Sequence, residues 1–146
     1  MKPEPPPARQ RSEPVPHVPA WDSVVASRRV DRPDARFLLR HGATDRVLLS
    51  GTGQGEAATT LLALARFDGQ PVVVLGQQRM ESGGGNVVGP GSLREARRGM
   101  ALAAELRLPL VLLIDTAGPA LSAEAEQGGL AGQIAQCLAE LVTLDT

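Results

Sequence analysis

The stretch Pro109-Leu-Val-Leu-Leu-Ile-Asp-Thr-Ala-Gly-Pro119 decides the fold class of this chain of 146 residues. Its continuous apolar run, Leu110–Ile114, predicts a strand that is covered on both faces. The small residues 116–119 then form a loop that leads toward a helix. Backbone N–H groups at the carboxyl end of such a strand are free to face a ligand. We therefore expect an α/β fold with its chemistry at this loop.

The elements upstream of this stretch are a hairpin and a helix. Apolar runs at Leu61–Phe67 and Pro71–Gly76 predict two strands, and the intervening Asp68-Gly69 is a strong hairpin signal. Ser92 and Glu95 form the pattern of a capping box, which predicts a helix that continues to about residue 107.

The remaining elements are helical. One helix is predicted over about 123–142, with an apolar stripe that contains Cys137 as a small core residue. Two short helices, Trp21–Arg29 and Pro33–His41, are expected before the first strand. Alternating strands and helices favour α/β packing. No strand follows the last helix, so we expect residues 20–146 to be an incomplete domain, truncated at its C-terminus.

The first 19 residues differ in composition from the rest of the chain. They carry prolines at seven positions (3, 5, 6, 7, 14, 16 and 19) among Arg, Glu and Gln. Such a segment cannot bury enough apolar surface to fold, so we expect residues 1–19 to be a disordered tail or linker.

Composition excludes several classes of function. The net charge of −1 and the few aromatic residues (Trp21, Phe37 and Phe67) argue against a nucleic-acid partner. Lys2 is the only lysine and lies in the tail, which excludes a catalytic or phosphate-loop lysine in the folded part. A single cysteine and two histidines do not suggest a metal site. The sequence shows no signal peptide and no membrane span, so a cytoplasmic location is expected.

Three glycine-containing segments are candidate sites. Gly51-Thr-Gly-Gln-Gly55 lacks the lysine of a phosphate loop and is read as a turn. In the loop 83–91, glycines allow close approach of a ligand, Asn86 is both donor and acceptor, and Arg94, Arg97 and Arg98 follow on the helix. These groups suit a phosphate or carboxylate; the alternative is a flexible loop beside a solvated arginine face.

The third candidate is the turn after the strand that ends at Ile114. Its backbone N–H groups suit the oxyanion of an enolate or thioester, and Asp115 is positioned to orient the turn through hydrogen bonds to the backbone. The alternative is a purely structural turn between a strand and a helix.

Residues 20–146 resemble the carboxyltransferase alpha subunit of biotin-dependent acetyl-CoA carboxylase and the corresponding half of related acyl-CoA carboxyltransferases. The resemblance lies in the order and spacing of short stretches over most of the chain. They are Ala20-Trp21-Asp22, Arg32-Pro33, Ala65-Arg-Phe-Asp-Gly-Gln-Pro-Val-Val-Val74, Gly76-Gln77, Asn86, Gly89-Pro90-Gly91, Arg94-Glu-Ala-Arg-Arg-Gly-Met100, Leu113-Ile-Asp-Thr116, Ala125-Glu126, Gly128 and Ile134-Ala135.

The resemblance implies a crotonase-like fold of repeated ββα units. It implies a transferase that moves a carboxyl group from carboxybiotin to acetyl-CoA, giving malonyl-CoA for fatty acid biosynthesis. The implied partners are a carboxyltransferase beta subunit, the biotin carboxyl carrier protein and the biotin carboxylase of an ATP-dependent complex. The active site would lie between the alpha and beta partners, with the biotin side on this half.

The resemblance also assigns roles to residues. Gly118 would be an oxyanion donor, and Asp115 would orient its turn. Asn86, Gly89, Gly91 and Arg94 would help to hold biotin or CoA. The family usually reads Ile-Asp-Thr-Pro-Gly-Ala here, whereas this chain has Ala117 and Pro119 in exchanged places. Because proline has no N–H, Gly118 is left as the nearby donor.

Two other functions stay open at this stage. The chain could be a non-catalytic assembly module that keeps only a surface for subunit contact. It could also be another CoA-thioester enzyme of the same fold, such as a hydratase or decarboxylase, for which Glu124 and Glu126 are the nearby candidate bases.

Overall fold

The structure is a computed structural model that describes residues 19–29, 31–49, 59–78 and 87–146. The chain divides into two compact units, Met1–Arg32 and Pro33–Thr146. In the first unit the structure describes helix α1 (Ala20–Ser27), which confirms the predicted first helix to within two residues. The Pro-rich residues 1–18, the turn Gly51–Gly55 and Asn86 lie outside the described residues.

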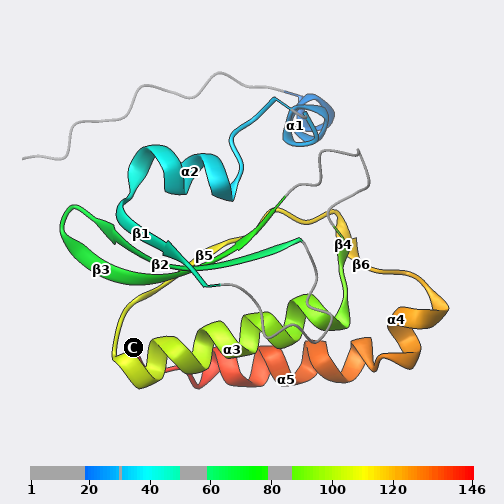
Figure 1. Cartoon of the computed structure of the whole chain (residues 1–146). Helices are drawn as coiled ribbons and strands as arrows, with labels where there is room; N and C mark the ends of the chain where they lie inside the picture. The colour runs from blue at the N-terminus through cyan, green and yellow to red at the C-terminus, as the bar shows by residue number, and fades with distance from the viewer. Residues whose placement is uncertain (1–18, 30, 50–58, 79–86) are drawn as a thin grey trace, which may run out of the picture. The chain divides into compact units, whose positions relative to one another are not determined.

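The second unit is built on a sheet with the strand order β1-β2-β3-β5. Three antiparallel strands, β1 (Thr44–Leu48), β2 (Thr60–Phe67) and β3 (Gln70–Gln77), are followed by β5 (Leu110–Leu113), which is parallel to β3. Figure 1 shows α2 (Ala35–Gly42) on one face of this sheet and α3 (Pro90–Leu106) on the other, with α5 (Leu130–Val142) beside α3. This arrangement confirms the predicted α/β class.

The core follows from the alternation of side chains along β2 and β3. One set, which includes Leu61, Ala63 and Val74, packs with Leu39 of α2. The other set, which includes Leu62 and Val73, packs with Ala103 of α3. Both faces of the central strands are therefore buried, and each is covered by a different helix.

The hairpin between β2 and β3 confirms the prediction from Asp68-Gly69. Phe67 pairs with Gln70, which leaves two residues in the loop. Both loop residues have positive φ, +49° at Asp68 and +82° at Gly69. This is the type I′ geometry that matches the twist of the strands, and Asp-Gly adopts it readily.

The helix predicted over Pro33–His41 is confirmed to within two residues, and one predicted helix start is wrong. Helix α2 begins at Ala35, because the Asp34 carboxylate caps it by accepting a hydrogen bond from the Phe37 N–H (2.7 Å). The capping box at Ser92 and Glu95 does not exist, because α3 begins earlier, at Pro90 after an N-cap glycine. Both residues of the supposed box lie buried inside α3.

The helix predicted over 123–142 is two helices, α4 (Ala123–Gln127) and α5. They are separated by Gly128 and by Gly129, whose φ of +76° cannot continue a helix. A Cβ at Gly128 would lie 2.9 Å from the Pro90 side chain, so the break also brings this turn against the start of α3.

The strand β5 differs from its prediction. It ends at Leu113, its four residues are half-buried, and within the described residues its one neighbour is β3. It is an edge strand of the described sheet. Val111 and Leu113 pack against the core on the α2 side and Leu110 against the core on the α3 side, so both faces are in contact with the core, as predicted, but only partly buried. The strands β1, β4 (Val87–Val88) and β6 (Gly118–Pro119) were not expected from the sequence.

Candidate active site

The candidate site lies at the carboxyl ends of the parallel strands β3 and β5. Gly76 is paired with Leu113, so both strands end at the same edge of the sheet. The side chain of Gln77 links the two ends, because its Oε1 accepts a hydrogen bond from the backbone N–H of Asp115 (2.6 Å). Ligands bind at this edge in many α/β proteins, and Gln77 is a positioning residue that the sequence reasoning missed.

Short strand pairing brings the two predicted parts of the site together. The strands β4 and β6 are parallel, with Val87 opposite Gly118 and Val88 opposite Pro119. The Ala120 N–H extends the pairing by donating to the Val88 carbonyl (2.9 Å). The loop after β5 therefore lies beside the segment that enters α3, as Figure 1 shows at the end of the sheet where α3 begins.

The turn around Gly118 has a backbone that favours glycine. Its φ is +135°, and a Cβ placed there would meet no atom within 4 Å. Its N–H, the predicted oxyanion donor, bonds to Thr116 Oγ1 (3.0 Å), and the Thr116 hydroxyl also lies 3.1 Å from the Gly118 carbonyl. Threonine side chains often bond to the backbone two residues further on, so the sequence could have indicated this turn at Thr116.

The start of α3 supplies the second part of the site. Its N-cap, Gly89, has no side chain to bond the first-turn N–H groups, and a Cβ there would meet no atom within 4 Å. Pro90 has no N–H, and Gly91 follows it in the first turn. The partial positive charge of this helix end and its small residues suit close approach of an anionic group.

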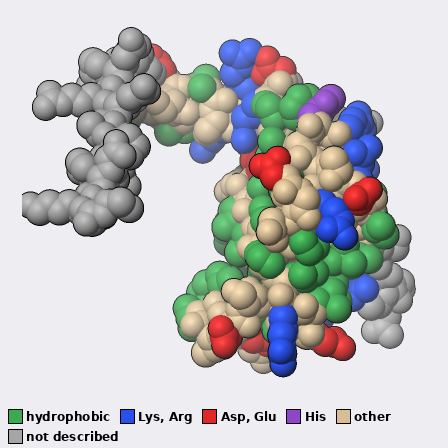
Figure 2. Space-filling model, turned by 90° about the vertical axis from the view of Figure 1, so that its left-hand side faces the viewer, with side chains coloured by type: hydrophobic (Ala, Val, Ile, Leu, Met, Phe, Trp, Pro, Cys, Tyr) green, Lys and Arg blue, Asp and Glu red, His purple; other side chains and the backbone are tan. Residues whose placement is uncertain are grey.

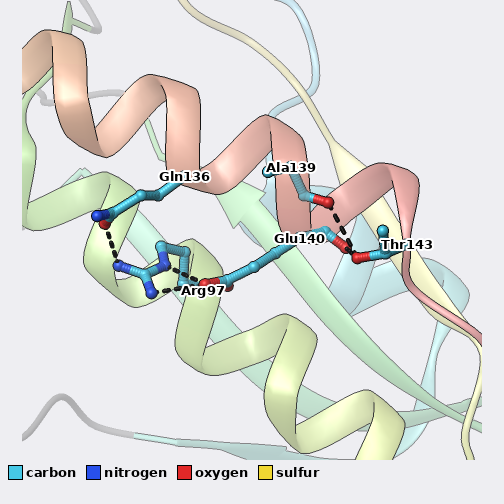
Figure 3. Close-up of polar contacts among 5 residues, drawn as sticks. All are labelled: Arg97, Gln136, Ala139, Glu140 and Thr143. Atoms are coloured by element: carbon cyan, nitrogen blue, oxygen red, sulfur yellow. Dashed lines mark hydrogen bonds and ion pairs between the residues drawn. The ribbon is translucent and has the colours of Figure 1, made fainter.

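The three arginines that follow are not equivalent. Arg97 bonds across to α5, where its Nε donates to Glu140 Oε1 and its Nη1 to Gln136 Oε1, each at 2.7 Å (Figure 3). Arg98 pairs with the buried Glu95 at 3.0 Å. Arg94 is exposed and forms no ion pair with the described residues. Of the predicted arginine cluster, the structure thus leaves Arg94 for a ligand.

The two candidate bases of a hydratase are exposed residues in the first turn of α4. Hydrogen bonding to its own backbone N–H and to Ser122 lowers the pKa of Glu124. A general base for work near neutral pH needs the opposite shift. The structure therefore gives no support to a hydratase built on Glu124.

The described residues contain neither a metal-binding cluster nor a membrane-spanning helix. No group of three or more His, Cys, Asp or Glu side chains is placed to hold a metal ion there. In the same part of the chain, no helix has the length and apolar character needed to cross a bilayer.

A family model described as a carboxyl transferase domain matches residues 1–146. The chain belongs to this family. Within the carboxyl transferase domain family, a probable biotin-dependent acyl-coenzyme A carboxylase beta3 subunit of Mycobacterium tuberculosis H37Rv is 82% identical over 144 residues, which is 99% of this chain and 29% of that protein. The chain thus spans less than a third of the length of this relative.

A second relative carries the name that the sequence resemblance suggested. An acetyl-coenzyme A carboxylase carboxyl transferase subunit alpha of Geobacter metallireducens is 33% identical over 131 residues, covering 85% of this chain and 41% of that protein. Both subunit names, alpha and beta3, therefore occur among the relatives of this carboxyl transferase domain.

Solved structures share the fold. The 12S transcarboxylase matches with a TM-score of 0.65 at 20% identity, over 76% of this chain and 21% of that chain. The beta subunit of geranyl-CoA carboxylase from Pseudomonas aeruginosa matches with a TM-score of 0.57 at 19% identity, over 73% of this chain and 20% of that chain. These likenesses confirm the crotonase-like fold class of the carboxyl transferase domain.

Proposed function

We propose that this chain is part of the carboxyltransferase of a biotin-dependent acyl-CoA carboxylase. The observation that carries the proposal is the parallel pairing of β4 with β6, which sets the uncapped start of α3 beside the Gly118 turn. Membership of the carboxyl transferase domain family supports the same reaction class. The proposed half is the alpha type, with acetyl-CoA as the acyl acceptor and malonyl-CoA as the product.

The local backbone fits a carbonyl-containing ligand. At both Gly89 and Gly118 the space that a Cβ would take is open, so a planar group can approach the main chain closely. Carboxybiotin, held on a carrier protein, would supply the carboxyl group when bound. Arg94, Gly89 and Gly91 would hold it or the CoA thioester, as would Asn86, which lies outside the described residues.

The proposed catalytic group is a backbone N–H rather than a titrating side chain. Carboxyl transfer develops negative charge on a carbonyl oxygen, and a fixed N–H stabilises that charge by about 3 kcal/mol. Gly118 would provide this donor once the Thr116 hydroxyl gives up its bond to the Gly118 N–H. Asp115, anchored through its backbone to Gln77, would fix the start of the turn.

The test is carboxyl transfer in the direction from malonyl-CoA to biocytin. The chain is mixed with a carboxyltransferase beta subunit, and release of acetyl-CoA is followed. Replacing Arg94→Gln should lower kcat/KM about tenfold, because a charge-assisted hydrogen bond contributes about 1.5–3 kcal/mol. Arg107→Asn is the matched control, since it removes the same charge at the other end of α3, where φ is +52° and Asn is tolerated.

Three outcomes are informative. Turnover that falls with Arg94→Gln and not with Arg107→Asn supports the proposal. A stable complex with the beta subunit that shows no turnover, while an intact acyl-CoA carboxylase is active in parallel, would favour the assembly module instead. Turnover when methylmalonyl-CoA replaces malonyl-CoA as the carboxyl donor, with release of propionyl-CoA, and no turnover with malonyl-CoA would overturn the choice of acetyl-CoA and leave the reaction class intact.

A further inference from the structure

An arginine-lined cleft lies on the sheet face opposite α3, between α2 and the strands β1 and β2. Its volume is about 240 Å³. We call it the arginine cleft. Among the described residues, its lining consists of three arginines and three leucines: Arg36, Leu39, Arg40, Arg46, Leu48 and Leu61. Figure 2 shows basic and apolar side chains next to one another on the face of the molecule that it presents.

Two of the three arginines, Arg36 and Arg46, are held in place by hydrogen bonds. Arg36 donates from its Nε to Gln78 Oε1, and the buried Gln78 is itself fixed by a bond from its Nε2 to the Thr60 carbonyl (2.9 Å). Arg46 Nη1 donates to the carbonyl of Arg40 (3.3 Å). These contacts go to neutral acceptors, so they position the guanidinium groups without neutralising them.

Nearby carboxylates are engaged elsewhere. Asp45 faces Arg66 at 3.5 Å, and Asp34 caps the start of α2. Within the described residues Arg40 forms no ion pair. Arg40 lies in the last turn of α2, where the negative end of the helix dipole stabilises its positive charge. This effect does not reach the charges of Arg36, at the start of α2, or Arg46, on β1. All three arginines are exposed, so solvent and salt screen part of their mutual repulsion, and an anion bound between them would remove the rest.

We propose that the arginine cleft binds a small organic phosphate. Guanidinium groups match the geometry of phosphate oxygens and remain charged at every physiological pH. Leu39, Leu48 and Leu61 give the cleft an apolar wall, which suits a ligand with a carbon skeleton better than inorganic phosphate. The volume limits the ligand to a small group, on the scale of a nucleoside monophosphate or less. The proposal is independent of the carboxyltransferase activity.

Isothermal titration of the full chain with AMP and with inorganic phosphate tests this site. The expected result is saturable binding of AMP that is tighter than binding of phosphate and weakens as salt rises from 50 to 500 mM. The double variant Arg40→Gln/Arg46→Gln should weaken AMP binding at least tenfold. Arg36 is left intact because it supports Gln78.

The control removes the same two charges elsewhere. Arg28→Gln/Arg107→Asn, at two exposed positions outside both sites, should leave AMP binding within a factor of two of the parent chain, and thermal unfolding of both double variants should match the parent. Arg40→Glu provides a second test, because charge reversal at one exposed position should abolish binding without disturbing Arg46. Absence of saturable AMP binding, equal binding of phosphate and AMP, or unchanged binding in Arg40→Gln/Arg46→Gln would each overturn the proposal.

Discussion

Gly76 is the residue at which the sheet and α2 leave no room for a side chain. A Cβ at this position would lie 2.6 Å from the Cβ of Ala35, and both residues are buried. Gly76→Ala therefore forces α2 away from the sheet and should lower the free energy of unfolding by about 1–3 kcal/mol, as measured by urea denaturation. Gly132→Ala is the control, because its Cβ would enter open space within a helix and should stabilise by about 0.5–1 kcal/mol. An equal effect of the two substitutions would contradict the close packing.

Cys137 is a residue whose chemistry is set by its surroundings on α5. Burial raises the pKa of its thiol, the charge of Glu140 raises it further, and Arg97 partly opposes both. Since the thiolate is the reactive form, alkylation by iodoacetamide at pH 8 should be several-fold slower than that of a peptide cysteine. Arg97→Gln removes the opposing cation, so it should slow alkylation further unless it also loosens α5. Alkylation of the native chain at the rate of the urea-unfolded chain would show that the thiol is not shielded.

At the scale of elements, the contact between α3 and α5 includes a polar bridge centred on Arg97 (Figure 3). The bridge is partly exposed, with 32% of the Arg97 side chain and 40% of the Glu140 side chain accessible. Such pairs contribute little, so a double-mutant cycle with Arg97→Ala and Glu140→Ala should give a coupling energy of about 0.3–1 kcal/mol that shrinks in 1 M NaCl. A coupling energy near zero in low salt would mean that apolar packing alone holds the two helices together.

The elements also show what the sequence could and could not predict. The hairpin was predictable because Asp68-Gly69 sets its own φ angles locally. The capping box failed because Ser92 faces Thr59 instead, with the two hydroxyl oxygens 3.2 Å apart, a contact between distant parts of the chain. The strands β4 and β6 have two residues each, too few for any periodicity, and exist through their mutual pairing. This pairing also brings the start of α3 beside the Gly118 turn. Each of these two parts of the candidate site was predictable from the sequence, but their contact was not.

At the scale of the whole molecule, the predicted apolar stripe of the last helix is only partly buried by the described residues. Of its residues, Leu130 is buried, whereas Leu138 and Leu141 are 57% and 37% exposed. The pattern of the sequence marks which face of a helix is apolar, but it does not say whether the described part of the chain covers that face. The apolar run of β5 was a better guide, because side chains on both of its faces contact the core, although its residues are only half-buried.

This exposed apolar row on α5 should make the chain associate with itself. Leu138, Leu141 and Val142 lie at helical spacings of three and four residues, so they form one continuous strip. Contiguous apolar surface of this kind favours association, and sedimentation velocity should show a mean mass that rises with concentration from about 5 to 200 µM. Leu138→Gln/Val142→Gln should remain monomeric over that range, while Leu106→Gln, another exposed apolar residue at the end of α3, should behave like the parent chain. A parent chain that stays monomeric throughout, or a double variant that associates as strongly as the parent, would contradict the role of this strip.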